Sequence, residues 1–208
     1  MNMSRLFWVG VLTAVAAVGN AAADRIVDTG TPANGPGYGL WDRQYFAGEF
    51  SIGQAETITG IQGYLAAFSG GAVEVALHNS AGNIPGSIIY LGSLSLAAGA
   101  GADWYGLANL SVSLAPGAYW VSFRPDASFN GIMPGTAPNP LADYASAAGH
   151  TPYDWKDYGP GVFAYLAQGL RIDAIATVPE PGSGALGALG LALVGGVLAM
   201  RRRSRQAG

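Results

Sequence analysis

Short runs of β-branched and aromatic residues alternate with polar residues along most of the chain, and Gly and Pro separate these runs. The clearest case is the stretch 72–78, in which Val73, Val75 and Leu77 occupy every second position. A period of two is typical of a strand with one buried face. Residues 24–177 contain no convincing amphipathic helical pattern, so the sequence predicts an all-β domain.

The runs and the turn residues between them predict eight or nine short strands. Strands are expected at residues 44–52, 57–68, 72–78, 87–96, 104–107, 110–114, 118–124, 161–168 and 170–177. Residues 79–86 contain Asn, Gly and Pro and are expected to form a loop. The sequence Ala115-Pro116-Gly117 is a turn signal and predicts a hairpin between its flanking strands. We therefore expect a two-sheet antiparallel sandwich of the jelly-roll or Ig-like kind.

The long segment 125–160 fits no strand pattern and is rich in proline. Loops of this length in a compact domain are usually functional or partly disordered. Aromatic and acidic residues alternate near its end, and the candidate glycan-binding residues there are Tyr153, Asp154, Trp155, Asp157 and Tyr158. Flat rings beside carboxylates suit a sugar ligand, but the same rings would also serve to fill one end of the sandwich.

The first residues predict a signal peptide over 1–23. A positive charge at Arg5 precedes a short apolar run, and Ala21-Ala22-Ala23 fits the small-residue cleavage pattern. We expect Asp24 to be the first residue of the exported domain, which then covers residues 24–177.

The C-terminal residues 178–208 predict a membrane-anchored tail. The uncharged stretch 182–200 would span about 28 Å as an α-helix, close to the thickness of the hydrocarbon core. The basic cluster 201–205 should stay in the cytoplasm, which places the preceding domain outside. Prolines disfavour helix before the span, so the residues around them are expected to be extended and accessible.

This tail resembles the PEP-CTERM sorting domain of exported bacterial proteins. The matching residues are Pro179, Glu180, Pro181, the apolar span, Arg201, Arg202 and Arg203. The resemblance implies recognition by an exosortase, which is a membrane-embedded cysteine protease, and cleavage near Pro-Glu-Pro. It also implies a host that makes exopolysaccharide or a biofilm matrix. The alternative is a permanent anchor that is never cut.

Several short sequence segments within the domain resemble a module of other PEP-CTERM proteins. They are Ala47-Gly48-Glu49-Phe50, Ile84-Pro85-Gly86, residues 114–121 and Asn139-Pro140-Leu141-Ala142. This resemblance supports a secreted β-sandwich and implies no particular chemistry.

Charge and cysteine content exclude two classes of function. The whole chain has a formal net charge of −3, but residues 24–177 alone carry about −7, because four of the basic residues lie in the tail. A domain this acidic repels nucleic acid. The chain has no cysteine, which excludes thiol nucleophiles and thiolate metal sites.

Catalytic and metal-binding patterns are weak. His78 and His150 are the only histidines, and no nucleophile motif surrounds Ser146. Asp143, Asp154 and Asp157 offer oxygen atoms to Ca²⁺, although no Ca²⁺-loop repeat is present and solvated carboxylates explain them better. We therefore assign no catalytic residue, no metal ligand and no cofactor.

The sequence as a whole predicts an exported, non-enzymatic protein of the cell envelope or extracellular matrix. It would be anchored in the inner membrane before processing. The alternatives are a carbohydrate-binding module for exopolysaccharide and, third, a polysaccharide-modifying enzyme.

Overall fold

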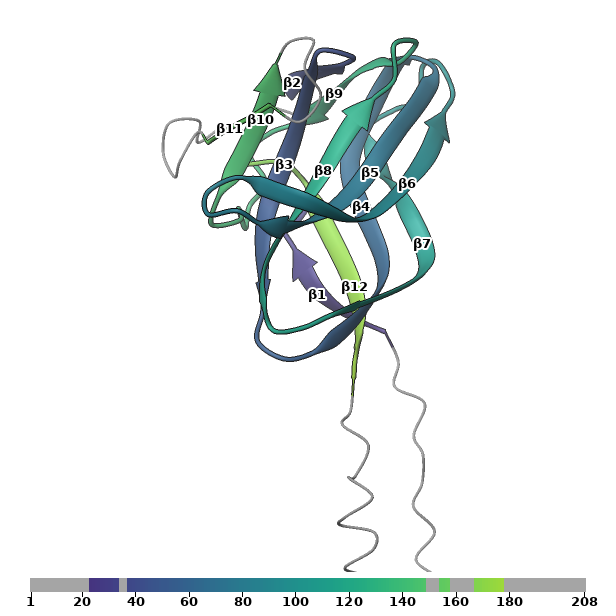
Figure 1. Ribbon diagram of the computed structural model, residues 1–208. Helices are drawn as coiled ribbons and strands as arrows, with labels where there is room; N and C mark the ends of the chain where they lie inside the picture. Colours follow the sequence, from purple (N-terminus) through teal and green to yellow (C-terminus); the bar gives the residue numbers. More distant parts are fainter. Residues whose placement is uncertain (1–22, 34–36, 149–153, 158–166, 178–208) are drawn as a thin grey trace, which may run out of the picture.

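A computed structural model describes residues 23–33, 37–148, 154–157 and 167–177, and these residues form an all-β domain (Figure 1). The strands are β1 (Asp24–Asp28), β2 (Gly37–Trp41), β3 (Gln44–Ile52), β4 (Glu56–Ser69), β5 (Gly71–Ser80), β6 (Pro85–Leu96), β7 (Asp103–Leu114), β8 (Gly117–Pro125), β9 (Asn130–Pro134), β10 (Tyr144–Ala148), β11 (Trp155–Asp157) and β12 (Leu170–Ala176). The prediction of an all-β domain is confirmed.

All the strand pairs are antiparallel, and they form one curled sheet in the order β1-β12-β4-β9-β2-β3-β8-β5-β6. β7 pairs with β4, β10 with β3, and β11 with β10. The long strand β4 belongs to both halves of the sheet, because its first part pairs with β12 and β7 and its last part pairs with β9. The finer prediction of two separate sheets in a jelly-roll or Ig-like sandwich is not confirmed.

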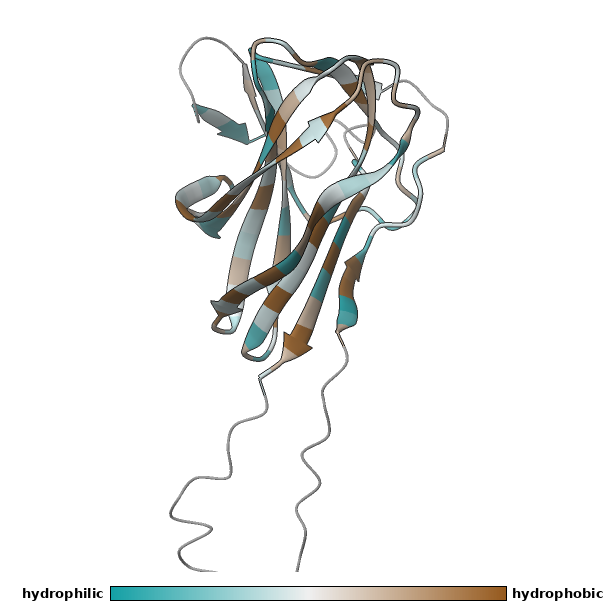
Figure 2. Ribbon diagram, turned by 90° about the vertical axis from the view of Figure 1, so that its right-hand side faces the viewer, coloured by the Kyte–Doolittle hydropathy of each residue, from teal (hydrophilic) through white to brown (hydrophobic). Residues whose placement is uncertain are grey.

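The core lies where the two halves of the curled sheet face each other. Val73, Val75 and Leu77 are fully buried, as their period of two predicts. A Cβ atom at Gly63 would lie 2.7 Å from the ring of Phe123, so glycine at this position lets the ring pack directly on β4. Apolar and polar bands alternate along the strands in Figure 2, as expected for a sheet that buries one face more than the other.

Six of the expected strands occur at nearly their predicted positions, namely β3, β4, β5, β6, β8 and β12. The runs 104–107 and 110–114 are a single strand, β7, in which Asn109 adopts a positive φ of 56°. Most of the expected strand 161–168 lies outside the described residues.

The hairpin predicted around Pro116 is wrong. β7 pairs with β4, whereas β8 pairs with β3 and β5. The turn crosses between the two halves of the sheet and runs beside the β3–β4 connection, because Leu114 pairs with Glu56 and Gly117 with Ile52. A turn signal in sequence shows that the chain reverses, but not which strand lies next to it.

The prediction of a strand-free segment at residues 125–160 is also wrong, because β9, β10 and β11 lie in it. These strands have 5, 5 and 3 residues, and Pro134 ends β9. Strands this short contain too few alternating positions for a pattern to show, and proline in a strand is confined to ends and edges.

Candidate functional site

The folded domain ends next to the predicted sorting tail. β12 pairs with β4 up to the pair Ala176–Glu56. The backbone N–H and the Oγ1 hydroxyl of Thr177 both donate to the carbonyl oxygen of Ala55, at 3.1 Å and 2.7 Å. The last described residue of the domain is therefore only two positions before Pro179.

The start of the domain lies beside this end. β1 pairs with β12, and Asp24 is opposite Ala174. Both chain termini consequently leave the domain at the same end (Figure 1). A leader and a membrane tail attached here would place one end of the domain toward the membrane.

The predicted sorting residues, Pro179 to Pro181 and Arg201 to Arg203, lie outside the described residues, as do nearly all of the predicted signal peptide and the predicted span 182–200. Within the part of the chain that the structure describes, no helix is long and apolar enough to cross a membrane.

Trp155, the central residue of the predicted glycan site, points into the protein. β11 pairs with β10 and β10 pairs with β3, and this places the indole ring edge-on to Tyr45, with centroids 5.3 Å apart. The ring of His78 lies 6.0 Å away, and Trp155 is only 8% exposed. This burial favours the alternative interpretation, in which the ring packs beneath its segment.

The other candidate glycan residues are divided between the surface and the undescribed part of the chain. Asp154 and Asp157 are exposed. The side-chain amide of Asn83 donates to Asp157 Oδ2 at 3.0 Å, so the β5–β6 loop is joined to β11. Tyr153 and Tyr158 lie outside the described residues. A glycan-binding role for this set stays a prediction.

His78 is fully buried beside Trp155. Its Nδ1 lies 3.1 Å from the carbonyl oxygen of Gly86, so Nδ1 carries the proton and donates. Its Nε2 then accepts from the Ser122 hydroxyl at 2.8 Å. Burial lowers the pKa of His78 below its ordinary value. Both ring nitrogens thus make hydrogen bonds inside the protein, whereas a catalytic base must be accessible to its substrate.

The acidic residues near β10 and β11 do not form a metal site in the described part of the chain. No group of three or more His, Asp or Glu side chains there is arranged to hold an ion. Burial, together with the nearby charge of Asp157, raises the pKa of Asp143 above its ordinary value.

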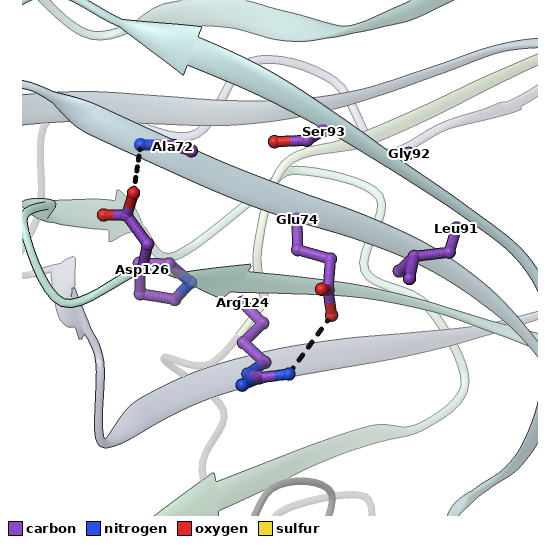
Figure 3. A pocket seen from close by; sticks show the side chains of 8 residues that line it. Ala72, Glu74, Leu91, Gly92, Ser93, Arg124 and Asp126 are labelled. Carbon is purple, nitrogen blue, oxygen red and sulfur yellow. Dashed lines mark hydrogen bonds and ion pairs between the residues drawn. The ribbon is translucent and has the colours of Figure 1, made fainter.

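One open groove of about 410 Å³ lies on the outer face of β5, β6 and β8 (Figure 3). Arg124 and Glu74 form an ion pair across its floor, with 3.4 Å between Nη1 and Oε1. The Asp126 carboxylate accepts from Ser128 and from the backbone N–H of Ala72, and these bonds lower its pKa. Leu91 of β6 also lines this groove.

A second open groove, of about 640 Å³, crosses the outer face of β1, β12, β4 and β7. Its polar lining residues are Arg25, Thr59, Gln62, Asn109 and Asp173. Glycine keeps the floor low at Gly106, where a Cβ atom would collide with the carbonyl oxygen of Ile61. The strand pairing shifts register beside the groove, between Ile58 and Gly60 and between Asp173 and Ala174. Bulges of this kind often re-aim side chains next to binding sites.

Sequence reasoning missed this second groove because its residues come from four strands that are far apart in the chain. The one local signal is Asn109, since asparagine is among the residues that tolerate a positive φ. An asparagine within a strand-like run is compatible with a bulge, but it does not reveal which strands lie beside it.

A sequence profile of the PEP-CTERM protein-sorting motif matches residues 177–203. The chain therefore carries this motif, which implies an exported, membrane-anchored precursor that an exosortase processes for the cell envelope. No curated protein matches the chain.

Proposed function

We propose that this protein is an exported, non-enzymatic component of the cell envelope or extracellular matrix. The observation that carries the proposal is the position of the PEP-CTERM motif, which begins at residue 177, immediately after the last strand ends at Ala176. The motif is attached to a folded domain with its own hydrophobic core, as expected for a sorting signal that follows its cargo.

The tail performs the sorting in two steps. The apolar span 182–200 holds the precursor in the inner membrane, with the basic cluster 201–205 on the cytoplasmic side. An exosortase then cuts near Pro-Glu-Pro and separates the domain from its anchor. The signal peptide 1–23 starts export at the other end of the chain.

A non-enzymatic role is supported by how the domain uses its polar side chains. His78 is buried and hydrogen-bonded on both ring nitrogens. The Arg124–Glu74, Arg25–Asp173 and Arg171–Asp28 ion pairs join neighbouring strands. These groups hold the sheet together, and this suits a structural component.

Mass spectrometry of the protein from its host tests the sorting proposal. Most mature molecules should end near residues 179–182 and lack the basic cluster. A matched chain in which Pro179 and Pro181 are replaced by alanine should keep its tail and accumulate in the membrane. Mature wild-type protein that retains Arg201, Arg202 and Arg203 would contradict the proposal and favour a permanent anchor.

A second candidate function is carbohydrate binding, with exopolysaccharide as the ligand class. The observation that favours it is the polar groove across β1, β12, β4 and β7, whose amide, hydroxyl and charged groups suit sugar hydroxyls. Asn109→Gly keeps the positive φ while it removes the amide, so it should weaken retention on host exopolysaccharide without lowering the melting temperature. Unchanged retention of this variant and of Gln62→Ala would exclude the groove.

A further inference from the structure

Strand β6 has an unusual composition for the surface of an acidic domain. No ionisable side chain other than Tyr90 occurs from Pro85 to Ala102. Five large hydrophobic side chains are exposed in the described part of the chain, and three of them lie on β6. These three are Ile88, Ile89 and Leu91, which are 41%, 43% and 50% exposed.

β6 is also an open edge of the sheet. It pairs with β5 on one side, and no strand in the described part of the chain pairs with its other side. The segment from Leu91 to Leu96 pairs regularly with Gly71 to Ala76, and register shifts occur only near His78. An edge of this kind presents unpaired backbone N–H and C=O groups, and natural proteins usually protect such edges with charges or proline.

We propose that β6 pairs with β6 of a second copy of this chain, antiparallel and about a two-fold axis near Ser93. Two such domains repel each other through most of their surface because each carries about −7. The β6 edge is the neutral exception, and the nearest acid on the neighbouring strand, Glu74, is paired with Arg124. A two-fold contact between identical edges is self-complementary and closes as a dimer.

This pairing has a consequence for the membrane-anchored precursor. β4 starts beside Ala55, which binds Thr177 at the tail end, and runs to Ser69. Gly71 follows and pairs with Leu96, so β6 ends at the far end of the domain from the tail. Antiparallel pairing of the two β6 strands reverses the strand direction of the second domain. The tail ends of the two domains then point in opposite directions.

Two copies anchored in one membrane therefore cannot pair in this way, and release of the tail makes pairing possible. This step rests on the proposed sorting function. The pairing would convert processed molecules into dimers away from the membrane, where a matrix component is needed.

Cysteine cross-linking in the native host tests the pairing, because the full chain has no cysteine of its own. Ser93→Cys places one thiol near the proposed axis, within reach of its symmetry mate. Ser113→Cys is the matched control, since Ser113 is exposed on β7, which in the described residues pairs with β4 alone. Ser93→Cys should give at least about tenfold more disulfide-linked dimer, because a disulfide needs Cα atoms within about 7 Å.

The fraction in which the dimer forms distinguishes the two proposals. Dimer should be found in molecules that lack the tail and be absent from membrane-anchored precursors. Detergent extraction frees uncleaved chains from their shared membrane, so extracted Ser93→Cys chains should also cross-link on oxidation. If no tail is ever removed but extracted chains cross-link, sorting fails and the pairing stands.

A second variant places a charge on the β6 edge in order to prevent the pairing. Leu91→Lys in the Ser93→Cys background should abolish the dimer while the melting temperature stays unchanged, because Leu91 is half exposed. Equal cross-linking from Ser113→Cys, or dimers of the anchored precursor, would overturn the proposal. Linkage of the Ser93→Cys chain to a different protein would also overturn it, as would a Ser93→Cys chain that stays monomeric in both the released and the extracted fractions.

Discussion

The middle parts of strands β3, β8 and β5 are buried on both faces, but in different ways. On the inner face Phe46, Phe123 and Val75 lie in register and pack against the other half of the curled sheet. On the outer face His78 and Trp120 lie in register, and Trp155 of the distant short strand β11 lies edge-on to His78. The inner face is apolar, whereas the outer face combines aromatic rings with hydrogen-bonded polar groups.

This difference shows that burial has two origins in the domain. The inner face is buried by the curl of the sheet itself, which any sequence with this alternation would favour. On the outer face, β10 extends the sheet beside β3, β11 brings Trp155 onto Tyr45 and His78, and Asn83 donates to Asp157 of β11. The first kind of burial follows a local pattern, and the second depends on a particular tertiary contact.

The largest expected effect is that of a charge in either face. Val75→Asp should destabilise the domain by at least about 4 kcal/mol, because the carboxylate would be unpaired in the apolar core. Ala76→Asp, on the outer face of the same strand, should also be strongly destabilising since Ala76 is only 1% exposed. Urea unfolding of both variants measures this, and a tolerated Ala76→Asp would mean that the outer face is open.

Truncation of the outer cover should have the next largest effect. Trp155→Ala should lower stability by about 3 kcal/mol, as large-to-small substitutions of buried aromatic residues do. Thermal melts and retention on host exopolysaccharide should be measured on the same variant. An unchanged melting temperature with weaker retention would instead favour the glycan-binding role predicted for Tyr153, Asp154, Trp155, Asp157 and Tyr158.

The stability of the domain should depend on pH through His78 on the outer face, and this effect should be smaller than that of Trp155→Ala. Burial lowers the pKa of His78 in the folded state, so the unfolded chain binds the proton more tightly. The stability from this neutral histidine is complete above the ordinary value of about 6.5 and is lost as the pH falls below it. Melting temperatures measured from pH 8 to pH 5 should fall more steeply for the wild type than for His78→Gln, and equal slopes would contradict the assignment.

The smallest effect is expected at Glu74, on the outer face of β5. Glu74 lies on the outer side of β5, partly exposed, and its ion pair with Arg124 spans 3.4 Å. Glu74→Gln should change stability by less than about 0.5 kcal/mol, because exposed ion pairs contribute little. A loss of stability as large as that of Trp155→Ala would show that Glu74 is more deeply buried on the outer face of β5.

The sequence allowed part of the fold to be predicted. β3, β5 and β12 were placed well because each has enough alternating positions for a period of two to be visible. β9, β10 and β11 were missed because they are too short for such a pattern, and β11 is held by pairing with β10. The β7–β8 hairpin was predicted wrongly because the turn at Pro116 connects strands whose partners lie elsewhere in the chain.

The candidate sites divide in the same way. The PEP-CTERM motif was found because its elements follow one another within residues 177–203. The burial of Trp155 was not predictable, because interleaved aromatic and acidic residues are compatible with both a binding loop and a covering strand. The polar groove was missed because its residues, such as Arg25 and Asn109, come together only through strand pairing.

The sequence by itself determined the all-β class, the inner face of the sheet and the sorting motif, since local alternation and contiguous residues encode each of them. Only the tertiary structure decided that β12 ends beside β1, that Trp155 packs against His78, and that β6 is an open edge among the described strands. These features depend on which strands pair across long stretches of chain. Strand pairing is a choice among many alternating segments of similar composition, and no single segment specifies its partner.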